Sequence, residues 1–177
     1  MSRPRILGGT AKGRELDTPR RGTRPSPSRL REALFDILAF EPRGVFLDLY
    51  AGSGAIGLEA ASRGWRVVCV DRSREAVQVI RANAARLALE VDVVGGDAIA
   101  AAEARPRAVD VLFAAPPYPF DLPPLFARLL ETDCVRSGGR YVFQHPTTLT
   151  LELERAGERV VADVRRYGSN ALTIVDA

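Results

Sequence analysis

A regular alternation of short apolar segments and helical segments constrains the fold of this chain more than any other feature. Five segments are short and rich in apolar or β-branched residues, as buried strands are: 45–50, 66–71, 91–94, 109–114 and 140–144. Helical spacing is found between or after them in residues 55–63, 73–89 and 122–132, and a short alanine-rich helix is expected after residue 97. Repeated strand–helix units predict a mostly parallel sheet with helices on both of its faces.

The two ends of the chain depart from this alternation. Ser26 or Ser28 is placed to cap a helix that runs to about Phe40. Residues 158–167 and 171–175 alternate in polarity around a turn, which predicts a hairpin that adds an antiparallel strand at or near one edge of the sheet. We expect two parts, a basic arm or hairpin in residues 1–25 and a single domain in residues 26–177, because a chain of 177 residues suits one core.

Charge is distributed unevenly along the chain. Residues 1–31 carry nine basic side chains and two acidic ones, whereas the whole chain has a net charge of only +3. A basic arm on a mildly acidic body indicates a polyanionic partner. The side chains that we expect to contact the phosphates of such a partner are Arg3, Arg5, Lys12, Arg14, Arg20 and Arg21. The alternative is a solvated surface enriched in arginine by codon usage, since Lys12 is the only lysine.

Composition argues against several classes of protein. No apolar run approaches the roughly 18 residues needed to span a bilayer, and no apolar signal segment follows the basic N-terminus. We therefore expect a cytoplasmic protein with no membrane partner. Cys69 and Cys134 match no metal-ligand or redox spacing, so we expect reduced cysteines and no metal site.

A glycine-rich loop follows the first expected strand. Gly52, Gly54 and Gly57 fit the pattern G-x-G-x-x-G, with a strand before it and a helix after it. Such glycines permit a tight turn and let backbone N–H groups approach a ligand closely. Asp71 lies at the end of the second strand, where a carboxylate can accept both hydroxyl groups of an adenosine ribose. The alternative is a glycine loop that serves only a tight turn.

The same pattern binds either NAD or S-adenosylmethionine, and Asp48 helps to separate them. An acid just before the loop is unfavourable for a pyrophosphate but suits a cationic ammonium and a sulfonium. Asp97 follows the third strand, where it is placed either to accept from the adenine amino group or to cap the next helix. The residues that we expect to bind S-adenosylmethionine are Asp48, Tyr50, Ala51, Gly52, Ser53, Gly54, Asp71, Arg72, Asp97 and Ala98.

A proline-rich loop follows the fourth strand and consists of Ala115, Pro116, Pro117 and Tyr118. The two prolines make the loop rigid, and the tyrosine can stack on a nucleobase. The loop resembles the [Asn/Asp/Ser]-Pro-Pro-[Tyr/Phe] motif of methyltransferases that act on exocyclic amines of bases. In that motif the first side chain and a proline carbonyl accept hydrogen bonds from the amine. We therefore expect these four residues at the reacting site.

The chain as a whole resembles the RsmD-type family of 16S ribosomal RNA guanine-N2 methyltransferases. Three further stretches carry the resemblance, residues 6–16, 24–35 and 48–64, and the match runs to about residue 145. The resemblance implies a Rossmann-like class I methyltransferase fold, with a seven-stranded, mostly parallel sheet and an antiparallel C-terminal hairpin strand. It also implies an RNA-binding N-terminal extension and places Arg24, Pro25 and Ser26 near the cofactor.

The activity implied by this resemblance is transfer of a methyl group from S-adenosylmethionine to the N2 amine of a guanine in 16S ribosomal RNA, free or within an assembling small subunit. One position departs from the family pattern, because Ala115 stands where the family has an acid or an amide. The lost hydrogen bond would cost about 1.5–3 kcal/mol, or about 10- to 150-fold in rate. Asp121 could replace the acceptor, although capping of the next helix is favoured for it. Gln144 and His145 are further candidates, although a structural role is favoured for a lone histidine before Pro146.

Three other functions stay open from the sequence. A DNA amino-methyltransferase would share both motifs, but the chain has no recognisable target-recognition domain. A non-catalytic RNA-binding or assembly factor is favoured only by Ala115. A small NAD-dependent oxidoreductase would need a proton-relay pair near residues 116–118, and the sequence offers none there.

Overall fold

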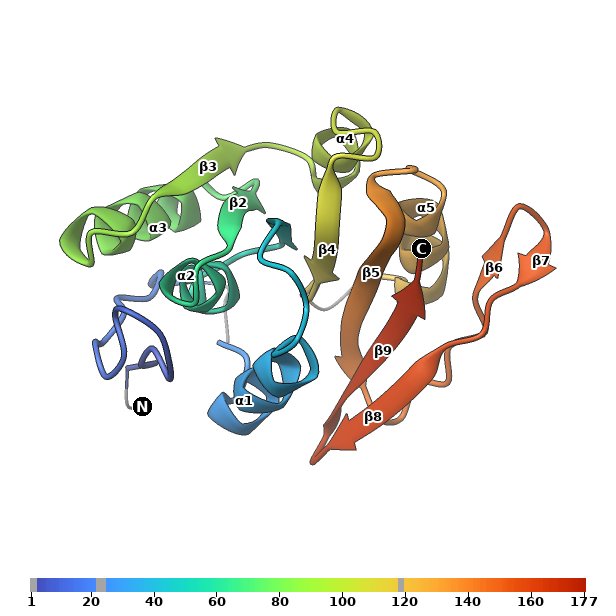
Figure 1. The fold of residues 1–177 in the computed structure, drawn as a ribbon, viewed down its shortest axis with the longest axis horizontal. Coiled ribbons are helices and arrows are strands. Elements are labelled where there is room, and N and C mark those ends of the chain that lie inside the picture. Colours follow the sequence, from blue (N-terminus) through green and yellow to red (C-terminus); the bar gives the residue numbers. More distant parts are fainter. Residues whose placement is uncertain (1–2, 22–24, 118–119) are drawn as a thin grey trace.

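The chain folds around one twisted sheet of seven strands in the order β3-β2-β1-β4-β5-β9-β8 (Figure 1). The computed structural model describes residues 3–21, 25–117 and 120–177. The strand bounds are β1 Val45–Leu49, β2 Arg66–Asp71, β3 Val91–Gly95, β4 Val109–Ala114, β5 Val135–Pro146, β8 Asp163–Tyr167 and β9 Asn170–Asp176. The first five strands in this order are parallel. β9 is antiparallel to both β5 and β8, so the C-terminal hairpin forms one edge of the sheet.

Helices cover both faces of this sheet, as the alternation predicts. Their bounds are α1 Ser28–Ile37, α2 Ala55–Ser62, α3 Arg74–Arg86, α4 Ala98–Glu103 and α5 Leu122–Leu130. Leu47 and Leu49 of β1 are fully buried in a cluster with α4 and α5. Phe46, the neighbour of Leu47, is fully buried in a second cluster with α1, α2 and α3. Successive side chains of a strand point to opposite faces, so one strand contributes to both cores.

The C-terminal part of the chain differs from its expected form. The strand expected over residues 158–167 is two separate strands, because β7 (Glu158–Arg159) pairs with β6 (Glu154–Arg155) in a small sheet of its own. β8 begins only at Asp163, after this hairpin. β5 is longer than expected and pairs irregularly with the start of β4, because Gly138 and Gly139 break the regular strand register there.

The expectation that Ser26 or Ser28 caps the first helix is wrong. Pro27 occupies the N-cap position of α1, and no side chain makes a capping hydrogen bond there. The Ser26 hydroxyl instead donates to Gln144 Oε1 at the end of β5, at 2.7 Å. The helix also ends at Ile37, earlier than the expected Phe40.

The N-terminal arm forms a small hairpin against α2 and α3 (Figure 1). Arg5 and Glu15 form an isolated antiparallel bridge. The apolar side chains of the arm pack with α2 and α3 in a third buried cluster, which contains Ile6, Ala11, Leu16, Ala55, Leu58, Ala84 and Leu87. Among the described residues, no helix combines the length and apolar character that a membrane crossing requires.

Candidate active site at the carboxyl ends of the strands

The glycine loop crosses from the end of β1 toward the end of β2. Ala51 N donates to Val70 O at 3.0 Å, and Gly54 N donates to Ala51 O at 2.8 Å. Tyr50, the first residue of the loop, has a φ of 60°. This left-handed conformation costs a non-glycine residue roughly 1–2 kcal/mol, and such strain gathers at ligand sites. The loop is therefore held in one defined shape before the first turn of α2.

Asp71 joins the glycine loop to the end of β2. Its Oδ2 accepts from Gly52 N at 2.9 Å, and its Oδ1 accepts from Ser73 N at 2.8 Å. Asp71 is half-buried at this edge of the sheet. Each carboxylate oxygen has a second lone pair, so the group can still accept the two hydroxyls of a ribose. The side chain that the sequence nominates for the ribose thus also shapes the loop that would hold the rest of the ligand.

Asp48 is buried beside α2, where its carboxylate contacts the backbone of that helix. Its Oδ2 accepts from Gly57 N at 2.9 Å. Burial raises the pKa of Asp48 to about 7, while the Gly57 hydrogen bond opposes the rise and the charge of Asp71 adds to it. A Cβ at Gly57 would lie 2.3 Å from Cys69 Sγ and 3.0 Å from Asp48 Oδ2. Glycine at 57 is therefore required by the close packing of α2 on the sheet.

Asp97 is the N-cap residue of α4, as one of its two expected roles requires. Its Oδ1 accepts from Ala100 N at 2.9 Å. The residue is exposed at the end of β3, so its second carboxylate oxygen stays accessible to a ligand. Capping and ligand binding are compatible here. Ala98, the residue after it, is buried beneath the helix start.

An aromatic and cationic cluster lies next to the glycine loop. The ring of Phe120 lies 5.7 Å from that of Tyr50, and the Arg72 guanidinium carbon lies 5.4 Å from the Phe120 ring centroid. Burial raises the pKa of Tyr50 to about 12, with a further contribution from Asp97. Phe120 follows the proline loop in the sequence, so this contact places the residue just after that loop beside Tyr50 of the glycine loop. Sequence reasoning did not nominate Phe120, although an aromatic directly after Pro-Pro-Tyr-Pro is a usable signal.

These residues fit an adenosine-type cofactor that carries no phosphate. The loop offers backbone at close approach, while the acceptors around it are carboxylates, which suit hydroxyl and amino groups. Gly54 has a φ of 78°, and a Cβ there would lie 3.0 Å from Ile80 Cγ1, so a side chain is disfavoured at this point of the turn. Ser53 is buried, and its Oγ accepts from Ala55 N at 3.3 Å at the start of α2.

The proline loop begins where β4 ends. Ala115 and Pro116 are half-buried and Pro117 is exposed. Ala115 packs against the cluster on the α1 side of the sheet. Tyr118, expected to stack on the base, and Arg24, expected near the cofactor, lie outside the described residues. Asp121 occupies the N-cap position of α5, but its side chain makes no capping hydrogen bond.

A chain of polar side chains lies at the end of β5, next to the proline loop. The Ser26 hydroxyl donates to Gln144 Oε1 at 2.7 Å, and Gln144 Nε2 donates to Asn170 Oδ1 at 3.3 Å. Ser26, placed near the cofactor by the resemblance, therefore contacts the end of β5. Asn170 was not nominated from the sequence, because it lies at the far turn of the C-terminal hairpin.

His145 points to the opposite face of the sheet and is buried. Its Nδ1 lies 2.9 Å from Pro146 O, and its Nε2 lies 2.7 Å from Thr173 Oγ1. A carbonyl oxygen only accepts, so Nδ1 carries the proton and Nε2 accepts from the threonine hydroxyl. Burial lowers the pKa of His145. Both ring nitrogens are engaged in structural hydrogen bonds.

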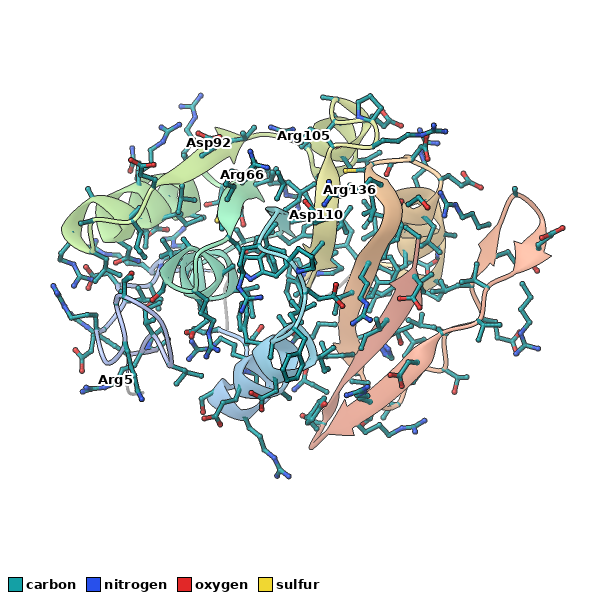
Figure 2. The ribbon with its side chains drawn as sticks, in the orientation of Figure 1. Arg5, Arg66, Asp92, Arg105, Asp110 and Arg136 are labelled. Atoms are coloured by element: carbon teal, nitrogen blue, oxygen red, sulfur yellow. The ribbon has the colours of Figure 1, made fainter. Side chains whose placement is uncertain are left out.

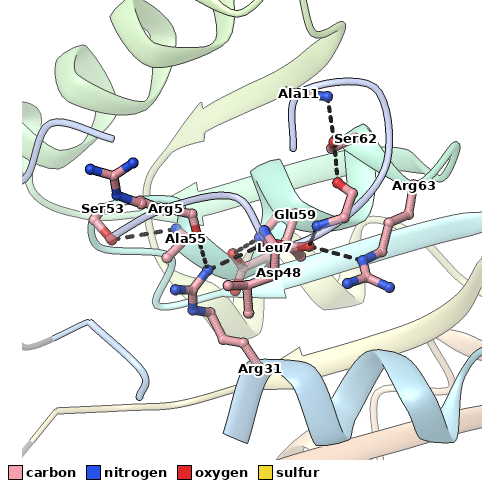
Figure 3. Close-up of polar contacts among 12 residues, drawn as sticks. Arg5, Leu7, Ala11, Arg31, Asp48, Ser53, Ala55, Glu59, Ser62 and Arg63 are labelled. Atoms are coloured by element: carbon pink, nitrogen blue, oxygen red, sulfur yellow. Dashed lines mark hydrogen bonds and ion pairs between the residues drawn. The ribbon is translucent and has the colours of Figure 1, made fainter. Parts of the chain in front are cut away.

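Glu59 of α2 anchors the arm to the domain (Figure 3). Its side chain is fully buried and accepts from Leu7 N and Gly8 N, both at 2.8 Å. Arg63 Nε donates to it at 2.9 Å, and Arg31 Nη1 lies 3.5 Å away while also donating to Arg5 O at 2.8 Å. Nothing in the sequence reasoning singled out Glu59, because an acid on a helix usually faces solvent.

The arm cations nominated for RNA fall into two groups. Arg3 pairs with Asp17 at 3.1 Å, and Arg5 pairs with Glu15 at 2.5 Å. The remaining four are exposed, and none of them forms an ion pair with another described residue: Lys12, Arg14, Arg20 and Arg21. These four are the better placed to contact phosphates.

Two cavities of about 270 and 260 Å³ lie away from the carboxyl ends of the strands. The first lies between α1 and the C-terminal hairpin, where Ile37, Val161 and Ile174 line it. The second lies at the amino end of the sheet beside Asp110 and Arg136, which Figure 2 shows close to each other. Neither is lined by the described residues of the glycine loop or the proline loop.

The chain is similar to known proteins over most of its length. The sequence model of a family described as conserved hypothetical protein 95 matches residues 4–176. The putative rRNA methyltransferase YlbH of Bacillus subtilis (strain 168) is 31% identical over an alignment of 179 residues. The alignment covers 96% of this chain and 97% of that protein. Ribosomal RNA small subunit methyltransferase D of Escherichia coli (strain K12) is 37% identical over 119 residues, or 64% of this chain and 60% of that protein.

A solved structure shows the same architecture. A hypothetical protein of Thermus thermophilus superimposes with a TM-score of 0.86 at 44% identity, covering 98% of this chain and 99% of that chain. The expected fold, a seven-stranded sheet with an antiparallel C-terminal hairpin, is confirmed by the strand order. With a match over nearly its whole length, the chain belongs to the family described as conserved hypothetical protein 95, the RsmD-type methyltransferases that its sequence resembles.

Proposed function

We propose that this protein transfers a methyl group from S-adenosylmethionine to the exocyclic N2 amine of a guanine in 16S ribosomal RNA. One observation carries the proposal: the hydrogen bond from Gly52 N to Asp71 Oδ2, at 2.9 Å. It joins the glycine loop and the ribose-binding acid into one cradle at the carboxyl ends of β1 and β2. The rRNA methyltransferase names of two relatives support the choice of substrate.

Bound S-adenosylmethionine supplies an electrophilic methyl group and departs as neutral S-adenosylhomocysteine, so the protein has no leaving group to protonate. The work of the chain is to align the reactants and exclude water. Asp71 accepts the ribose hydroxyls on the lone pairs that its backbone partners leave free. Asp97 offers its second oxygen to the adenine amino group. Asp48 acts on the loop, through Gly57, rather than on the ligand.

The base is held by the loop after β4. The Pro116 carbonyl accepts a hydrogen bond from one N–H of the amine, which directs the nitrogen lone pair toward the methyl group. The methylated nitrogen then releases one of its two protons to solvent. Tyr118 stacks on the guanine once the base is turned out of its RNA context, a role that rests on the Pro-Pro-Tyr motif alone. The exposed arm cations Lys12, Arg14, Arg20 and Arg21 contact RNA phosphates. The reaction takes place in the cytoplasm, on free RNA or on an assembling small subunit.

Methyl incorporation from labelled S-adenosylmethionine tests this proposal. The purified protein is given unmethylated 16S ribosomal RNA, small-subunit particles that contain it, and duplex DNA, and the labelled nucleoside is identified by mass spectrometry. We expect N2-methylguanosine from the RNA substrates and no label in DNA. Label in DNA would favour a DNA amino-methyltransferase, and label on another guanine atom would refute the N2 assignment.

Calorimetry separates the remaining alternatives. Binding of S-adenosylmethionine without turnover on either RNA substrate would favour a non-catalytic assembly factor. Tighter binding of NAD than of S-adenosylmethionine would favour an oxidoreductase. Asp71→Ala is the negative control in each assay, because it removes the proposed cofactor contact.

A further inference from the structure

The register of β4 and β5 places Gln144 beside Ala115, the position where the family motif has a side-chain acceptor. Ala114 pairs with Phe143 in these parallel strands, so Ala115 and Gln144 are the next residues along two adjacent strands. Ala114 and Phe143 both pack in the cluster of α4 and α5. Since side chains alternate between the faces of a sheet, Ala115 and Gln144 both face the α1 side. The packing of Ala115 against the cluster on that side agrees.

Gln144 is held in place from two directions. Ser26, just before α1, donates to its Oε1 at 2.7 Å, and Asn170 Oδ1, at the start of β9, accepts from its Nε2 at 3.3 Å. These two contacts fix the plane of the carboxamide at the carboxyl edge of the sheet. Each of these two atoms can make one more hydrogen bond, because Oε1 has a second lone pair and Nε2 has a second proton.

We propose that the Gln144 carboxamide oxygen is the second acceptor for the target amine, in place of the side chain that the family motif has at position 115. The inference rests on the proposed function. A carboxamide presents an acceptor beside a donor, and the N2–H and N3 edge of guanine presents a donor beside an acceptor. Oε1 and the Pro116 carbonyl then accept hydrogen bonds from the two N–H groups of the amine, which aims the nitrogen lone pair at the methyl group.

The two other acceptors nominated from the sequence are less suited to this role. His145, the next residue of β5, lies on the opposite face and has both ring nitrogens engaged. Asp121 lies on the α5 side of the proline loop and is exposed at the start of that helix. Of the three nominated acceptors, Gln144 alone combines a place on the Ala115 face with a side chain held in one orientation.

The test moves the acceptor from one strand to the other. Gln144→Ala, Ala115→Asn and the double variant are compared with the parent in single-turnover methylation of unmethylated 16S ribosomal RNA at saturating S-adenosylmethionine. We expect Gln144→Ala to lower the rate by about 10- to 150-fold, the loss expected for one hydrogen bond to a developing charge. Its dissociation constant for S-adenosylmethionine should stay within about twofold of the parent. We expect Ala115→Asn to restore at least a third of the lost rate in the Gln144→Ala background.

Two further variants serve as controls. Gln78→Ala makes the same substitution at an exposed position of α3 and should leave the rate unchanged. Asp121→Ala should change the rate by less than about threefold, and a larger loss there than at Gln144 would overturn the assignment. Rescue by Asn at 115 is the decisive readout, because an amide at that position cannot repair a purely structural defect at the end of β5.

The possible failures are distinguishable. If the parent transfers no methyl group to RNA, the proposed function and this inference fail together. If the parent is active and Gln144→Ala keeps its rate, only this inference fails. A loss in Gln144→Ala that is matched by weaker cofactor binding, or that Ala115→Asn does not rescue, assigns Gln144 a structural role and overturns it as well.

Discussion

The site has two halves, which we name after their proposed ligands: the cofactor half around the glycine loop and the base half around the proline loop and the end of β5. They differ in what their polar side chains bond to. On the cofactor half, Asp48, Asp71 and Asp97 each accept from a backbone N–H at 2.9 Å. On the base half, Gln144 bonds to two side chains, Ser26 and Asn170. A carboxylate that holds backbone can be exchanged only for a side chain that keeps the same acceptor, because otherwise the backbone that it holds would lose its partner. A contact between side chains can be moved to another residue, so we expect this half to tolerate Ala115 where the family motif has an acceptor.

The N-terminal arm is attached to the cofactor half. Its backbone is held by Glu59 at two N–H groups, and Glu59 lies on α2, the helix that begins at the glycine loop. Ser62, one turn later, donates to Gly8 O at 2.6 Å and accepts from Ala11 N at 2.9 Å. One short helix therefore carries both the cofactor loop and the attachment of the arm, which predicts that damage to the attachment affects the whole cofactor half.

The largest effect should come from Glu59→Gln. This change leaves the buried Arg31 without its charged partner and removes an acceptor from the arm, and breaking a buried pair costs about 3–5 kcal/mol. Urea denaturation measures the loss in free energy of unfolding. Glu103→Gln is the matched control, because Glu103 pairs with Arg128 on the surface, where a pair contributes about 0–1 kcal/mol. Equal losses in the two variants would show that the arm attachment is no stronger than a surface contact.

The buried carboxyl of Asp48 should make stability depend on pH. Burial raises its folded-state pKa from 3.8 to about 7, so between pH 4 and pH 7 the folded protein binds more protons than the unfolded chain. Stability contributed by this group is present below about pH 4 and is lost as the pH rises through 7, by up to about 4 kcal/mol at 1.36 kcal/mol for each pKa unit.

Asp48→Asn should remove most of this dependence, because the amide oxygen can still accept from Gly57 N without carrying a charge. The measurement is urea denaturation of parent and variant at pH 4.5 and 7.5. Asp36→Asn, at an exposed carboxylate of α1, controls for loss of one negative charge. If the difference in stability between parent and Asp48→Asn is the same at both pH values, the Asp48 carboxyl has no raised pKa.

The same division of the molecule decides what the sequence could predict. The cofactor half was predicted because its signals are local, as in the close spacing of Gly52, Gly54 and Gly57 after an apolar strand. For the base half, the sequence predicted the proline loop and three possible acceptors but not which acceptor is held in place. The contact of Ser26 with Gln144 joins residues 118 positions apart, so no local pattern reveals it. Glu59 was missed for a related reason, since its partners at residues 7 and 8 are 52 and 51 positions away.

The variant Asp71→Ala tests whether Asp71 binds the cofactor as well as shaping the glycine loop. Asp71→Ala removes the acceptor of Gly52 N and the proposed ribose contact together, and the dissociation constant for S-adenosylmethionine should rise at least about tenfold, or about 1.4 kcal/mol. Calorimetry measures the change. Asp92→Ala, at an exposed aspartate of β3, is the control and should bind like the parent. An unchanged constant for Asp71→Ala would leave Asp71 with the loop-shaping role alone.

The smallest effect should separate the two groups of arm cations. Arg20 is exposed and only its backbone N–H is engaged, by Glu75, so its guanidinium can meet a phosphate directly. Arg20→Gln should lower the slope of log affinity against log salt by about 0.7–0.9 and weaken RNA binding by about five- to eightfold at 0.1 M salt. Arg5 already neutralises Glu15, so its guanidinium would have to exchange one partner for another.

Arg5→Gln should therefore change the salt slope by less than half as much as Arg20→Gln. Filter binding of unmethylated 16S ribosomal RNA between 0.05 and 0.5 M salt (about the range over which such slopes are linear) measures both. Equal changes in slope would mean that RNA displaces the ion pairs of the arm. In that case the arm would be held firmly by its backbone, but its side chains could exchange partners. The contrast between the two halves would then apply to backbone contacts and not to the side chains of the arm.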